Sequence, residues 1–151
     1  MSSFALSSSS PTPVASRADS RGRFALVGLA TVAAAVIANL LVYALGSLLV
    51  GYDPQFVVLA NASGTILFTV VPAIVAVLLY AVLMRFASNP ARVFTNIAVV
   101  VLIVSLIPDL TYIPSVPGAS SGQTAILMVM HVVAAVVIVG MLTTLTRSRR
   151  S

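Results

Sequence analysis

The sequence predicts an all-α integral membrane protein, a four-helix bundle with both termini in the cytoplasm. Three observations support this prediction. Of the 151 residues 60% are hydrophobic and only 7% are charged, four long apolar segments follow one another, and every arginine flanks these segments on one side. A soluble domain usually carries roughly 25% charged residues. A chain this apolar therefore belongs in a lipid bilayer.

The four apolar segments cover about residues 24–50, 64–84, 90–107 and 123–146, and together they form one membrane domain over residues 24–146. Each can cross a hydrocarbon core of about 30 Å as a helix. Their apolar residues do not alternate with polar ones as in a barrel strand, so helices are expected. Asn89-Pro90 places an N-cap residue and a first-turn proline at the start of the third helix.

Residues 1–23 are expected to form a disordered cytoplasmic tail, and residues 147–151 a short basic one. The first tail is rich in serine, proline and arginine, and it has few large apolar side chains to offset the entropy of ordering. A cleavable signal peptide is the competing interpretation. However, the run from Phe24 to Val50 is far longer than the apolar region of about 7–15 residues in such peptides, so we expect an anchor.

The arginines predict the orientation. Both tails and the connection between the second and third segments hold all eight arginines, whereas the connections at about 51–63 and 108–122 hold none. Basic residues that flank membrane-spanning helices stay on the cytoplasmic side. Both termini of this cell-membrane protein are therefore predicted to face the cytoplasm. The topology determinants are Arg17, Arg21, Arg23, Arg85, Arg92, Arg147, Arg149 and Arg150.

The two arginine-free connections have different expected structures. Asp53-Pro54 before an apolar run that includes Phe56 and Leu59 predicts a short helix lying at the membrane interface. Residues 112–122 are rich in proline, glycine and serine, and they are expected to be irregular and to lie on the membrane surface.

Polar side chains are costly inside a bilayer, so those within or beside the apolar segments form the candidate functional site. Counted by helical rise, four of them fall at a similar depth in the outer half of the bundle, and we call them the polar layer: Asn39, Thr69, Ser105 and His131. Tyr43 lies one turn outside Asn39. Asp109 lies above the layer, about 12 Å from the height of His131, and helix tilt or a dipping loop must close that offset.

Each candidate also has a structural interpretation. Thr69 and Ser105 can donate to a carbonyl of their own helix, and Asn39 can join two helices. Asp109 can cap a helix end. His131 is either a packing residue with satisfied nitrogens or a group that handles protons or a ligand.

Composition excludes several kinds of chemistry. A chain without cysteine forms no disulfide, thiolate metal site or thiol redox centre. One histidine and three aspartates are too few for a zinc site within one chain, and no metal or other cofactor is expected. The arginines lie in short separate segments that form no continuous basic groove, so nucleic acid is not an expected partner.

Three sequence features carry a resemblance: Ser105-Leu106-Ile107-Pro108-Asp109-Leu110, then, after a loop, Met130-His131-Val132-Val133-Ala134-Ala135, and the turn Asn89-Pro90-Ala91-Arg92-Val93-Phe94. With them, residues 24–146 resemble the bacterial four-helix membrane proteins that are grouped as a domain of unknown function and are common in actinobacteria. The resemblance implies a four-helix membrane protein and supplies no activity.

Three function classes remain. Scarce polar residues and the small-residue row Ala30, Ala34 and Ala38 favour a membrane scaffold or interaction module, with the lipid bilayer and a second copy or another membrane protein as partners. The alternative is binding or transport of a small molecule or proton through the polar site around His131 and Asp109. A membrane oxidoreductase subunit ranks last, because one histidine cannot supply both axial ligands of a haem within a chain.

Overall fold

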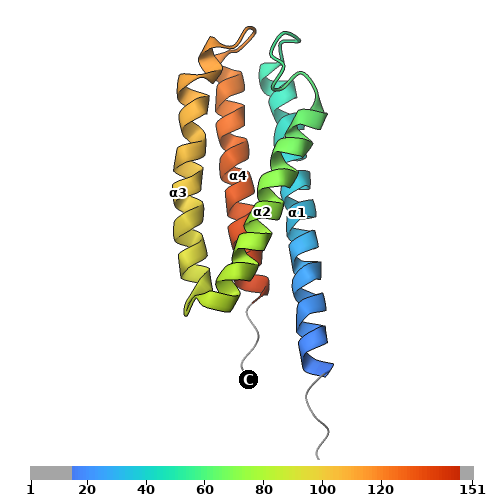
Figure 1. The fold of residues 1–151 in the computed structure, drawn as a ribbon. Coiled ribbons are helices and arrows are strands. Elements are labelled where there is room, and N and C mark those ends of the chain that lie inside the picture. Colours follow the sequence, from blue (N-terminus) through green and yellow to red (C-terminus); the bar gives the residue numbers. More distant parts are fainter. Residues whose placement is uncertain (1–14, 147–151) are drawn as a thin grey trace, which may run out of the picture.

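The computed structural model describes residues 15–146, in which four helices form an antiparallel bundle (Figure 1). The helices are α1 (Ala15–Val50), α2 (Ala62–Phe86), α3 (Pro90–Thr111) and α4 (Ser121–Leu145), with a 3-10 helix, η1 (Ile113–Ser115), between the last two. All four are long and apolar enough to cross a membrane. The described residues contain no strand. The prediction of an all-α four-helix membrane protein is confirmed.

Helices that follow one another in the chain also pack together. α1 packs mainly against α4 and α2, and α3 packs more closely against α4 than against α2. The α1–α2 and α3–α4 connections lie at one end of the bundle, which we call the loop end (Figure 1). The α2–α3 connection lies at the other end, with the start of α1 and the end of α4. We call this the arginine end, because it holds Arg21, Arg23, Arg85 and Arg92.

α1 begins before its predicted start. Residues 15–23, which the sequence predicts to be disordered, are helical. Once the apolar run has nucleated a helix, each further residue adds a hydrogen bond, and alanine and arginine favour the helical state. With 36 residues α1 is about 54 Å long, and it extends beyond the other helices at the arginine end (Figure 1). Residues 1–14 and 147–151, with Arg147, Arg149 and Arg150, lie outside the described residues.

Two helices begin at side-chain caps. The Asn89 side chain accepts a hydrogen bond from the Arg92 N–H at 3.2 Å, and Pro90 follows it as predicted. At α4, Ser120 and Gln123 form a capping box in which each side chain bonds the backbone N–H of the other. The spacing Ser-x-x-Gln is a readable signal for this cap, and it starts α4 at Ser121, slightly before the predicted residue.

The predicted interfacial helix around residues 53–59 does not form, and the segment makes a series of turns instead. Asp53 Oδ1 accepts a hydrogen bond from the Gln55 N–H at 2.8 Å, a local bond that competes with helix formation. Phe56 and Leu59 are 0% and 1% exposed. They pack into a loop-end apolar cluster with Ile113, Leu127 and Met130. The connection therefore closes the loop end of the bundle.

A second apolar cluster fills the part of the bundle nearer the arginine end and comprises Ala35, Ala73, Tyr80, Phe94, Ile138 and Leu142. The Tyr80 and Phe94 rings meet edge to face at 5.0 Å and 72°, a favourable aromatic geometry. The buried row on α1 is Thr31, Ala35 and Asn39. It is offset by one residue from the predicted row, of which Ala30 is exposed.

Candidate functional site

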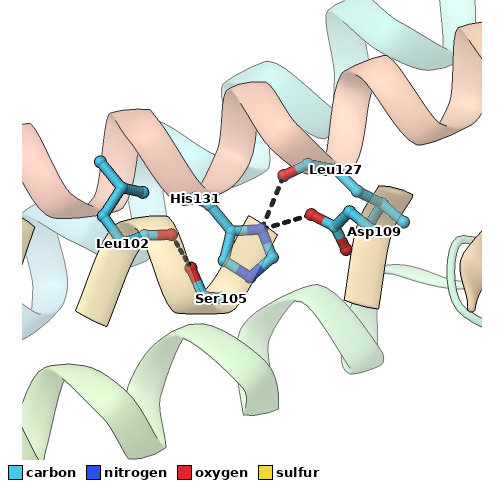
Figure 2. A network of polar contacts seen from close by, with 5 residues as sticks. All are labelled: Leu102, Ser105, Asp109, Leu127 and His131. Atoms are coloured by element: carbon cyan, nitrogen blue, oxygen red, sulfur yellow. Dashed lines mark hydrogen bonds and ion pairs between the residues drawn. The ribbon is translucent and has the colours of Figure 1, made fainter. Parts of the chain in front are cut away.

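Asp109 of α3 and His131 of α4 meet at the interface between these two helices (Figure 2). Nδ1 of His131 lies 3.1 Å from Oδ2 of Asp109 and 2.9 Å from the carbonyl oxygen of Leu127, one turn earlier in α4. Asp109 is 5% exposed, whereas 39% of the His131 side chain is exposed. The site therefore pairs a buried carboxyl group with an accessible imidazole.

The offset of about 12 Å expected between these side chains is absent. α3 continues through Pro108 to Thr111, so Asp109 lies inside the helix and not at a loop above it. Side chains lean toward the N-terminus of their own helix. Because α3 and α4 are antiparallel, Asp109 leans toward the arginine end while His131 leans toward the loop end. The two side chains thus approach one another along the bundle axis.

One proton position follows from the geometry around Nδ1. A carbonyl oxygen only accepts hydrogen bonds, so Nδ1 carries the proton when it bonds Leu127. Asp109 Oδ2 then has no hydrogen bond among the described residues, although it lies within contact distance of Nδ1. Nδ1 cannot direct a single proton in line to both acceptors. A small ring rotation, or a proton on Oδ2, would replace the bond to Leu127 by a bond to Asp109.

The hydroxyl groups of the polar layer bond within their own helices. Ser105 Oγ donates to the Leu102 carbonyl at 2.7 Å, as Figure 2 shows. Thr69 Oγ1 donates to the Thr65 carbonyl at 2.7 Å. These bonds match the structural interpretation of both residues, and they leave each hydroxyl oxygen free to accept.

Asn39 and Thr69 form a second contact between helices, here α1 and α2. Asn39 Nδ2 donates to Thr69 Oγ1 at 2.9 Å, and both side chains are buried. Asn39 Oδ1 and Thr65 Oγ1 have no hydrogen-bond partner among the described residues. Within the described part of the chain, no hydrogen bond joins this pair to Asp109 or His131. The predicted polar layer is therefore not one connected group, because Asn39 and Thr69 join α1 to α2 whereas His131 meets Asp109 between α3 and α4.

Tyr43 does not join either contact. Its hydroxyl donates to the Leu59 carbonyl at 3.1 Å, while the Tyr52 hydroxyl donates to the Tyr43 carbonyl at 2.8 Å. The two rings lie 5.0 Å apart. Burial and the neighbouring Tyr43 raise the pKa of the Tyr52 phenol above its ordinary value. Tyr43 therefore fastens the α1–α2 connection to α1.

Two hollows lie at opposite ends of the bundle. One of about 460 Å³ opens at the loop end beside Tyr52, Asp53 and Gln123. The other, of about 410 Å³, opens at the arginine end beside Arg21 and Arg23. Neither is lined by a residue of the polar layer. Across residues 21–146, no three His, Cys, Asp or Glu side chains gather into a group that could hold a metal ion.

Residues 19–148 match the family described as "Family of unknown function (DUF6069)". The match covers most of the chain, so the chain belongs to this family. The expected likeness to a family of four-helix membrane proteins of unknown function is thereby confirmed. No curated protein and no solved structure is significantly similar to the chain. Family and fold together identify a multi-pass membrane protein, and neither assigns an activity.

Proposed function

We propose that this protein is an interaction module of the cell membrane that associates with a second copy of itself through the lipid-facing side of α3. The observation that carries the proposal is that the other helices cover little of α3, in which only Phe94 and Asp109 are buried. A stripe of branched side chains remains exposed along it at helical spacing. We call it the α3 stripe: Val100, Ile103, Val104 and Ile107.

The chemistry of the α3 stripe favours contact between helices. Helix association in lipid depends on van der Waals packing, since lipid chains are as apolar as the side chains themselves. Valine and isoleucine have one strongly preferred side-chain rotamer in a helix, so they lose little entropy when a partner helix packs on them. The two polar contacts join helices within the bundle, which fits a structural role for these side chains.

The proposed orientation places the arginine end in the cytoplasm. Arg21, Arg23, Arg85 and Arg92 all belong to this end, and the connections at the loop end contain no basic residue. Positively charged flanks are retained on the cytoplasmic side during insertion. A second copy inserted in the same orientation gives a two-fold axis along the membrane normal, so each residue of the α3 stripe lies near its own copy.

Single cysteines test the proposed association, since the natural chain contains none. We expect the Val100→Cys variant to form disulfide-linked dimers when membranes are oxidised. Val75→Cys on α2 is the matched control, because the native valines are 60% and 59% exposed. It should remain monomeric. Equal cross-linking at both sites, or none at Val100 and its neighbours in the α3 stripe, would overturn the proposal.

A second candidate function is proton transfer through His131 and Asp109. The specific observation in its favour is Asp109 Oδ2, which is buried, lies 3.1 Å from Nδ1 and has no hydrogen bond among the described residues. If the pair conducts protons, liposomes that contain the protein should lose an imposed pH gradient faster than empty ones. His131→Ala and Asp109→Asn should each restore the slow rate. A wild-type rate equal to that of empty liposomes rejects this function.

A further inference from the structure

The hollow at the arginine end has two chemically different parts. It opens between the start of α1 and the ends of α2 and α4, with a volume of about 410 Å³. Arg21 and Arg23 supply the cationic part. The apolar part comes from all three helices: Phe24 and Val27 of α1, Met84 of α2 and Leu145 of α4.

Helical spacing separates these parts along the membrane normal. Phe24 lies one turn beyond Arg21 on α1, and Val27 lies one turn beyond Arg23. The guanidinium groups therefore lie nearer the end of the bundle, and the apolar side chains lie deeper. Phe24 also begins the apolar run of α1, while Leu145 ends α4. The hollow thus lies where lipid phosphates meet hydrocarbon.

We propose that this hollow binds the headgroup and upper acyl chains of an anionic phospholipid. Arginine forms paired hydrogen bonds with phosphate oxygens through its planar guanidinium group. Basic hollows between membrane helices are suited to such headgroups, and the attraction adds to that of the charged leaflet. The apolar walls distinguish a lipid from a free phosphate ion, because only the lipid has chains that cover Val27, Met84 and Leu145.

Other arginines at this end differ in their surroundings. The Arg85 guanidinium lies 5.8 Å from the centre of the Phe86 ring, a cation–π contact. Arg92 is exposed in the first turn of α3. Neither residue lines the hollow. A double change at Arg85 and Arg92 therefore removes the same charge from the same end of the bundle and leaves the proposed site intact.

Native mass spectrometry of the full chain in detergent tests the proposal with dioleoyl phosphatidylglycerol and, as the neutral comparison, dioleoyl phosphatidylcholine. We expect the wild type to prefer phosphatidylglycerol. Each arginine near the phosphate should contribute roughly fivefold in affinity, so Arg21→Gln/Arg23→Gln should weaken phosphatidylglycerol binding roughly 25-fold. Arg85→Gln/Arg92→Gln should retain the wild-type affinity. An equal loss in both double variants would show attraction to a general basic surface and would overturn the site.

Two further measurements separate charge from shape. Leu145→Trp fills the apolar part of the hollow and keeps every charge, so it should also weaken phosphatidylglycerol binding. Unchanged binding in this variant would overturn the proposal. An excess of inorganic phosphate should not displace the lipid from the wild type. Displacement would assign the site to phosphate alone, and equal binding of the two lipids would remove the role of the charged headgroup. Neither result bears on association through the α3 stripe.

Discussion

Removal of His131 alone should destabilise the bundle more than removal of His131 and Asp109 together. We expect His131→Leu to lower the free energy of unfolding by about 2–3 kcal/mol, because it leaves a buried carboxyl group without its neighbour. This is below the usual cost for a fully buried pair, since 39% of the imidazole side chain is exposed. His131→Leu/Asp109→Leu removes both polar groups and should cost less than about 1 kcal/mol. Unfolding in mixed detergent micelles gives both values.

Together with the Asp109→Leu single variant, these changes form a double-mutant cycle, and the Asn39–Thr69 contact provides its control. It also joins two helices, but neither group is ionisable, and hydrogen bonds of this kind in membranes average about 0.6 kcal/mol. Asn39→Ala and Thr69→Ala should therefore show a smaller coupling than the α3–α4 contact. If the two changes at His131 and Asp109 are additive, their contact contributes nothing to stability and the expectation is wrong.

The sequence predicts the helices well because membrane insertion depends on properties that each segment carries alone. Four apolar runs of sufficient length must form helices, since the bilayer interior offers the backbone no other hydrogen-bond partners. The start of α3 is similarly local, because Asn89 and Pro90 need no distant residue to cap it. The missed capping box at Ser120 and Gln123 is also local, and a search for Ser-x-x-Gln would have found it.

Partner choice among the polar side chains could not be predicted in the same way. Helical rise predicts a similar depth for Asn39, Thr69, Ser105 and His131. It does not predict which neighbouring helix each side chain points toward. The structure joins Asn39 to Thr69 and His131 to Asp109 and keeps these contacts separate. Side chains lean toward the N-terminus of their own helix, so on antiparallel helices they lean in opposite directions along the bundle axis. A depth calculated from helical rise alone does not include this displacement.

The loop-end connections show the same limit. Phe56 and Leu59 lie in an apolar stretch after Asp53-Pro54, and this pattern suits a helix at the interface. Their burial depends on Ile113 and Leu127, which come from distant parts of the chain. A composition pattern does not distinguish apolar side chains that face lipid from those that close a bundle.

Gly118→Ala should destabilise the loop end far more than Gly51→Ala. Both glycines have positive φ, 75° at Gly118 and 70° at Gly51. This left-handed conformation costs an alanine about 1–2 kcal/mol. A methyl group at Gly51 would meet no heavy atom within 4 Å, so that backbone cost is the whole expected effect.

At Gly118 the same methyl group would lie 2.8 Å from the Phe56 backbone nitrogen and 3.1 Å from Asp53 Cγ. The backbone must move to relieve the first contact, and such overpacking typically costs a further 1–3 kcal/mol, for a total of about 2–5 kcal/mol. Movement there also withdraws Phe56 from the loop-end cluster. Gly118→Ala should therefore raise amide hydrogen exchange across residues 51–61, whereas Gly51→Ala should not. Equal stability and exchange in the two variants would show that the connections do not pack against one another.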